Sequence, residues 1–211
     1  MTPLQKYYET QASTIIKGLE KRGMEGYYCA SSAEAVEKVM SMIPEGSSVA
    51  WGGSATLNET GMMDALLASN FKKIDRNTAS SPEEKIKLEH DAFSADYYFM
   101  STNAITADGE LVNVDGNGNR VAALIYGPDH VMILAGMNKV TADVEAAFKR
   151  LRTVAGPANT TRLNLDTPCR QTGTCKNCLS PDGICAHTVI TRYDRPKGRI
   201  KVFLIGESLG F

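Results

Sequence analysis

Short apolar runs alternate with helical patterns along most of this 211-residue chain, and this alternation limits its fold more than any other feature. Two clear runs are Val131-Met132-Ile133-Leu134 and the closing stretch at 199–207. Strands that are apolar along their whole length and are separated by helices are typical of a largely parallel sheet covered on both faces. The sequence therefore predicts an α/β fold, in which the final strand returns to the main sheet.

Two segments in the second half of the chain carry more detailed predictions. The run Val121–Tyr126 is expected to be a strand that pairs antiparallel with Val131–Leu134, because only Gly127-Pro128-Asp129 joins the two. A helix is expected over residues 142–155, capped by Thr141, with acidic residues early and basic residues late.

The charge and hydropathy of the chain exclude two classes of partner. Lys and Arg number 23 against 24 Asp and Glu, so no strong basic field favours nucleic acid. No apolar run approaches the roughly 20 residues of a membrane helix, and the N-terminus lacks the order of a signal peptide. A cytoplasmic protein with neither a membrane nor a nucleic acid as partner is expected.

A Gly-Gly-Ser loop follows the predicted strand at residues 48–51 and leads into a helix for which Thr56 and Glu59 are expected to form a capping box. Such a loop presents backbone N–H groups and the positive end of a helix dipole to an anion. It is neither a Walker loop nor a dinucleotide-binding fingerprint, both of which need further residues that are absent here. A tight turn that requires small residues is the competing interpretation.

The stretch Tyr97–Arg120 contains a strand, a hairpin turn at Asp108-Gly109 and a second turn rich in Gly, Asn and Asp. Lys139 likewise follows an apolar strand, where α/β proteins gather ligand-binding groups. Ordinary surface turns and a solvated lysine are the alternatives. Residues expected to line one pocket for a small anionic ligand are Gly52, Gly53, Ser54, Asn103, Asp115, Gly116, Asn119 and Lys139.

Two carboxylates are the candidates for acid–base catalysis in this pocket, Asp115 and Glu59. Each has a competing structural role. For Asp115 this is turn formation, and for Glu59 it is the capping of the helix.

Four cysteines lie close together before the last strand with the spacing C-x5-C-x2-C-x6-C, and they are Cys169, Cys175, Cys178 and Cys185. Four thiolates complete a tetrahedral zinc site or hold an iron–sulfur cluster, and a cluster is the preferred interpretation over zinc. His187 is a weaker candidate ligand, Cys29 is expected to be a small buried hydrophobe, and an unmetallated loop remains the alternative.

The predicted division of the chain is an α/β domain at 1–160 and 199–211 with a Cys-rich metal-binding segment at 161–198.

Several motifs together resemble the LUD-domain family, also called DUF162, of the lactate-utilisation protein C type. They are GGSATLNETG, STNAITADGELVNVDGNGNR, GPDHVMILAGMNKV, TPCRQTGTCKNC and VFLIGESLGF, and they span nearly the whole chain. The resemblance implies the three-layer α/β fold of the NagB/RpiA-like superfamily, which includes sugar-phosphate isomerases and CoA-transferases. The Cys-rich segment would be an insertion in that fold.

The resemblance also implies a function, and three hypotheses follow. The first is a part of an iron–sulfur-dependent redox system such as L-lactate oxidation to pyruvate, with a 4Fe-4S cluster and with iron–sulfur oxidoreductase subunits or further copies of the chain as partners. The second is a stand-alone transferase or isomerase for a phosphorylated or CoA-linked substrate, with zinc as a structural clip. The third is a non-catalytic subunit that binds a partner.

Overall fold

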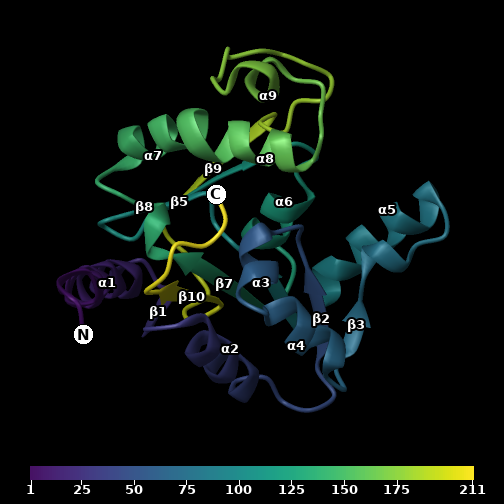
Figure 1. Cartoon of the computed structure of the whole chain (residues 1–211). Helices are drawn as coiled ribbons and strands as arrows, with labels where there is room; N and C mark the ends of the chain where they lie inside the picture. Colours follow the sequence, from purple (N-terminus) through teal and green to yellow (C-terminus); the bar gives the residue numbers. More distant parts are fainter.

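The structure, a computed structural model that describes residues 1–211, is built around a six-stranded parallel sheet (Figure 1). All five neighbouring pairs run parallel, in the order β1-β10-β7-β4-β2-β3. The last strand of the chain thus lies inside the sheet, as predicted. The strands are β1 (Glu25–Cys29), β2 (Ser48–Trp51), β3 (Lys72–Ile74), β4 (Tyr97–Met100), β7 (His130–Gly136) and β10 (Ile200–Ile205).

Helices cover both faces of this sheet and bury its apolar strands, which confirms the predicted α/β class. One face packs against α1 (Pro3–Lys21) and α6 (Asn119–Ile125), and the other against α2 (Ser32–Ser41), α3 (Ala55–Glu59) and α4 (Met62–Ala68). The remaining helical segments around the sheet are α5 (Pro82–Asp91) and the short turns η1 (Arg76–Thr78), η2 (Ala92–Ser94) and η3 (Met137–Lys139). None of the helices combines the length and apolar character that crossing a membrane requires.

A second, smaller sheet has the order β8-β5-β6-β9. Strands β5 (Ala104–Thr106) and β6 (Leu111–Asp115) form the hairpin predicted at Asp108-Gly109. Gly109 has φ +86°, and a Cβ there would lie 2.7 Å from the backbone nitrogen of Leu19, so only glycine lets the turn pack on α1. The outer strands are β8 (Val140–Thr141) and β9 (His187–Thr191).

The predicted strand at Val121–Tyr126 is wrong, because residues 119–125 form helix α6. Gly118 caps this helix with φ +83°. Val121, Ala123 and Leu124 are buried, the last two in the core against the main sheet. Strand β7 pairs instead with β4 and β10, both parallel, so the predicted antiparallel hairpin does not form. A six-residue apolar run fits either a strand or a buried helix, and only packing decides between them.

The helix predicted over residues 142–155 begins later and continues further. It is capped by Asp143, whose carboxylate accepts a hydrogen bond from the N–H of Ala146 at 2.8 Å, whereas Thr141 belongs to β8. The chain runs through α7 (Val144–Arg150), the π-helical turn η4 (Leu151–Ala155) and α8 (Gly156–Arg162). Pro157 lies at the start of α8, directly after the π-helical turn.

The predicted capping box of Thr56 and Glu59 is also wrong. Helix α3 is capped by Ser54, whose hydroxyl accepts from the N–H of Leu57 at 3.3 Å. The Glu59 carboxylate instead accepts a hydrogen bond from the N–H of Gly210 at 2.6 Å, and so holds the C-terminal residues beside α3.

The Cys-rich segment (residues 161–198) contains one short helix, α9 (Pro168–Thr172), and strand β9. Because β9 pairs antiparallel with β6, the segment is fixed to the second sheet at its far end. Figure 1 shows α9 and the loop after it above α7 and α8, on the opposite side of the molecule from α2 and α4.

Candidate functional site

A cavity of about 560 Å³ opens at the carboxyl ends of the parallel strands. Loops that follow β2, β4 and β7 form its floor, since the carboxyl ends of parallel strands share one edge of a sheet. Helix α8 and the Cys-rich segment close the other side. The cavity brings together seven of the residues predicted from the sequence, namely Gly53, Ser54, Asn103, Asp115, Gly116, Asn119 and Lys139.

Two predicted site residues do not line this cavity, Gly52 and Glu59. A Cβ at Gly52 would lie 3.1 Å from Cδ of Arg120, so this glycine makes room for an arginine side chain. Glu59 is bound to the C-terminal backbone as described above, so the structure places this acid–base candidate outside the cavity.

Lys139 is the most deeply buried charged side chain of the cavity, with 3% of its surface exposed. Its Nζ donates hydrogen bonds to Oγ1 of Thr56 at 2.9 Å and to Oγ of Ser101 at 3.0 Å. No carboxylate lies within ion-pair distance of Nζ. A buried ammonium without a counterion is costly, so the site favours either an anionic ligand or the neutral amine.

Burial lowers the pKa of Lys139 to about 7. Burial is the largest cause of this value, the nearby guanidinium groups of Arg150 and Arg120 also lower the pKa, and Glu59 opposes them with a smaller effect. The amine is therefore close to half protonated at neutral pH, and a bound anion would favour its charged form.

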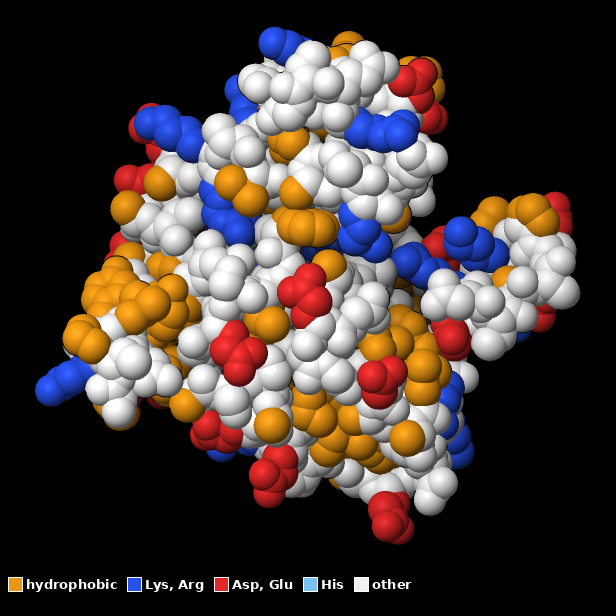
Figure 2. Space-filling view, viewed as in Figure 1, with side chains coloured by type: hydrophobic (Ala, Val, Ile, Leu, Met, Phe, Trp, Pro, Cys, Tyr) orange, Lys and Arg blue, Asp and Glu red, His pale blue; other side chains and the backbone are white.

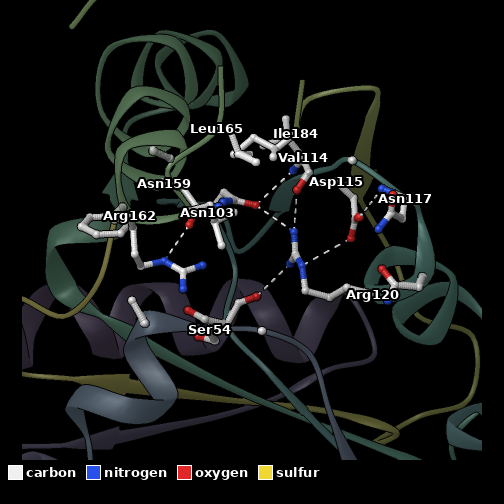
Figure 3. Close-up of a pocket in the computed structure, with 18 of the residues that line it drawn as sticks. Ser54, Asn103, Val114, Asp115, Asn117, Arg120, Asn159, Arg162, Leu165 and Ile184 are labelled. Carbon is white, nitrogen blue, oxygen red and sulfur yellow. Dashed lines mark hydrogen bonds and ion pairs between the residues drawn. The ribbon is translucent and has the colours of Figure 1, made fainter. Parts of the chain in front are cut away.

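Arg120 joins the two sheets beneath the cavity (Figure 3). Its guanidinium donates to the side chains of Asn113 at 2.7 Å and Asn103 at 3.0 Å, and to the carbonyls of Val114 at 2.6 Å and Ser101 at 3.0 Å. Since Ser101 follows β4 and Val114 belongs to β6, this one side chain fixes the main sheet against the second.

Asp115 uses both carboxylate oxygens for structure. Oδ1 accepts from the backbone N–H groups of Asn117 at 3.2 Å and Gly118 at 2.9 Å, and Oδ2 lies 3.5 Å from Nε of Arg120. The carboxylate thus shapes the turn that leads into α6, the alternative role considered for it. It lines the cavity with only 8% of its surface exposed.

The Cys-rich segment forms a wall of the same cavity. Its residues Asp182, Gly183 and Ile184 line the cavity next to Gly116. A Cβ at Gly116 would lie 3.2 Å from Cα of Ile184, so glycine allows the two backbones to approach closely. Cys185, the last of the four clustered cysteines, directly follows this contact in the chain.

The lining of the cavity is basic although the chain as a whole has a formal net charge of −1. Figure 2 shows Lys and Arg side chains along the boundary between the α7–α9 region and the rest of the molecule. Arg162, from α8, uses Nε to donate to Asn159 at 2.9 Å, and its terminal nitrogens make no hydrogen bond within the chain. The charged residues that line the cavity are Arg76, Lys85, Arg120, Lys139 and Arg162 against Asp115 and Asp182.

All five cysteines are free thiols, and Cys29 is buried in β1, away from the other four. Burial raises the pKa of the Cys185 thiol, and the neighbouring thiols of Cys175, Cys178 and Cys169 raise it further. Burial alone would raise the pKa of Cys169 as well, but hydrogen bonds with the hydroxyls of Thr160 and Thr167 and with backbone N–H groups together outweigh it and lower this pKa.

The four clustered thiols fit an iron–sulfur cluster or zinc by their donor chemistry, since neighbouring thiolates are stabilised by a shared cation. No three His, Cys, Asp or Glu side chains are arranged as a metal ion requires in the chain as it stands. Binding of a metal ion or cluster would therefore require the Cys-rich segment to bring the four sulfur atoms closer together. His187 lies in β9 opposite Asp115, beside Gly118.

Several residues of the cavity were not predicted, and they include Thr56, Ser101, Arg120, Asn159 and Arg162. Ser101 and Arg120 had a usable signal, since one ends an apolar strand and the other follows a Gly-rich turn. Arg162 carries no such signal, because it lies at the start of the predicted Cys-rich segment, outside the strand-end loops.

A parallel sheet between two layers of helices, with a basic cavity at its carboxyl edge, defines the class of this protein as α/β. The sequence model of the LUD domain family matches residues 12–205. The chain therefore belongs to the LUD domain family, as the sequence motifs indicated. At the level of the family, this membership supports a lactate-utilisation-type protein. Comparison with curated proteins finds no match.

A solved structure supports this assignment of the fold. A DUF162 family protein from Deinococcus radiodurans is similar with a TM-score of 0.56 at 11% identity, over 94% of this chain and 98% of that chain. Ribose 5-phosphate isomerase A from Neisseria gonorrhoeae gives a TM-score of 0.35 at 14% identity, over 52% of each chain. A TM-score of 0.35 supports no further conclusion about the chain.

Proposed function

We propose that this LUD protein binds a small carboxylate anion in the basic cavity and takes part in an iron–sulfur-dependent redox step such as the oxidation of L-lactate to pyruvate. The observation that carries the proposal is Lys139, a buried amine without a carboxylate partner at the floor of the cavity. Arg162 adds a second positive charge whose terminal nitrogens are free for an anion.

The position of the Cys-rich segment supports the redox part of the proposal. Ile184 lines the cavity and Cys185 is the next residue, so a cluster on the four thiols would lie near a ligand bound there. Oxidation of L-lactate releases two electrons and two protons, and a bound cluster would accept and pass on electrons. Iron–sulfur oxidoreductase subunits are the proposed final acceptors.

Anion binding is tested by calorimetric titration with L-lactate and pyruvate, with the uncharged lactamide as the ligand control. Lys139→Met and Arg162→Met should each weaken lactate binding about tenfold or more, the equivalent of about 1.4 kcal/mol, because each removes a positive charge from the cavity. Lys6→Met, at an exposed position on α1, is the matched control and should bind as the wild type does. Equal binding of lactamide and lactate would contradict the proposal.

The metal centre is tested in protein purified without oxygen. Iron and sulfide with visible absorption that bleaches on reduction are expected, and Cys178→Ser should lose them while the α/β core stays folded. Cys29→Ala is the matched control, since Cys29 is buried on β1 and should not affect the metal. Colourless protein with one zinc would favour the structural clip, and protein with neither metal would rule out a centre at these thiols.

The volume of the cavity supports a second candidate function. Cavities of roughly 300–1,000 Å³ hold drug-sized molecules, and lactate fills only a small part of about 560 Å³. The basic residues Arg76 and Lys85 at the cavity would suit the phosphate of a larger substrate. A transferase or isomerase for a phosphorylated or CoA-linked substrate is therefore the alternative, and tighter binding of a sugar phosphate than of lactate would favour it.

A further inference from the structure

The amine of Lys139 has an environment suited to covalent chemistry as well as to charge pairing. It lies inside a cavity, it is almost completely buried, and its only hydrogen-bond partners are two hydroxyl groups. A neutral amine has two N–H donors and one lone pair. If Thr56 and Ser101 take the two donors, the lone pair stays available to a ligand.

We propose that Lys139 is a nucleophile whose Nζ forms an imine with the carbonyl carbon of a small 2-oxo acid held in the cavity. This inference rests on the anion site proposed above and names the chemical class of its ligand. Lysine amines become nucleophilic when they are desolvated or lie next to another cation, and Lys139 meets both conditions through its burial and the nearby Arg150 and Arg120.

The step balances without an oxidant or reductant. The Nζ lone pair attacks the carbonyl carbon to form the C–N bond, and the carbonyl π electrons move to oxygen. The two amine protons then leave with that oxygen as one water molecule, and the hydroxyls of Ser101 and Thr56 are placed to relay them. Arg162 remains to hold the carboxylate of the ligand.

The test is trapping with borohydride in the presence of pyruvate, followed by peptide mass spectrometry of the full-length wild-type protein. Borohydride delivers a hydride to the imine carbon, so the trapped lysine gains the mass of one pyruvic acid minus one oxygen atom. The adduct should map to Lys139 alone at pH 7. At this pH an ordinary lysine with a pKa near 10.5 has roughly a thousandfold less neutral amine than Lys139, whose pKa is about 7.

Lys139→Arg should abolish trapping, since arginine keeps a positive charge but has no primary amine. Lys6→Met, which removes an exposed lysine of α1 outside the cavity, is the matched control and should trap as the wild type does. Trapping at Lys139 should also rise as the pH rises through about 7. Should the arginine variant not fold, the adduct position in the wild type decides the question.

The two proposals fail separately, because L-lactate has no ketone and binds without an imine. Lactate binding without a pyruvate adduct on Lys139, or adducts spread equally over exposed lysines, would overturn the imine and leave the anion site standing. An adduct on Lys139 without any lactate binding would support the imine and contradict the lactate proposal.

Discussion

Lys139→Met is expected to raise the free energy of unfolding at pH 7 relative to the wild type, and this gain should shrink as the pH rises. In the wild type the pKa of Lys139 is about 7 when folded, against 10.5 for an ordinary lysine in the unfolded chain. Between these values the unfolded state binds more protons than the native state, so wild-type stability increases with pH. Methionine has no such dependence.

Each pH unit inside this window contributes about 1.4 kcal/mol, so the difference between the two proteins should narrow by about 2–3 kcal/mol between pH 7 and pH 9. The absolute gain at pH 7 is smaller than the full ionisation cost, because Thr56 and Ser101 lose a hydrogen-bond donor. Urea unfolding of both proteins at pH 7, 8 and 9 measures this difference in the free energy of unfolding.

Lys85→Met is the matched control for this experiment, since Lys85 is exposed on α5 and its charge is solvated in both states. Its difference from the wild type should not change with pH. A constant difference between wild type and Lys139→Met across the same range would show that Lys139 keeps an ordinary lysine pKa in the folded protein.

Arg120→Met should destabilise the fold by about 3–5 kcal/mol, the range expected when one partner of a buried charged network is removed. The substitution removes the hydrogen bonds to Ser101, Asn103, Asn113 and Val114 and the ion pair with Asp115. Because this network joins the two sheets, the second sheet should loosen first. Hydrogen exchange should then speed up at β6 more than at β7.

The matched control is Arg76→Met, which removes an ion pair with Glu89 at 2.9 Å near the surface of the same cavity. Such a pair contributes up to about 1 kcal/mol, so the loss should be several-fold smaller. If both variants lose the same stability in urea unfolding, Arg120 does not have the central role that its hydrogen bonds indicate.

The strand-end loops show what local sequence can predict about a binding site. Each of Gly53, Ser54, Asn103 and Lys139 follows an apolar strand, and parallel pairing of these strands brings the four residues to one edge of the sheet. For Glu59 the sequence predicts either an acid–base role in the pocket or the capping of α3. Neither prediction includes its contact with Gly210, because 151 residues separate the two in the chain.

Helix α6 shows where local sequence is insufficient. The run from Val121 to Tyr126 is apolar and short, and a buried strand has the same pattern. The αL conformation of Gly118 and the packing of Leu124 on the main sheet favour the helix. Gly118 was visible in the sequence, but its role as a helix cap depends on the Asp115 turn before it.

The sequence by itself determined the α/β class, the parallel strands and the family, because hydrophobic periodicity and short motifs are local properties of the chain. Only the tertiary structure decided how the charges of the site are balanced. Lys139 meets Thr56 and Ser101 from 83 and 38 residues away, and no pattern encodes the absence of a carboxylate beside it. The Cys-rich segment likewise became a wall of the cavity through the contact of Ile184 with Gly116. The cost of burying a charge depends on every group that surrounds it in space, and neighbours in the sequence supply few of them.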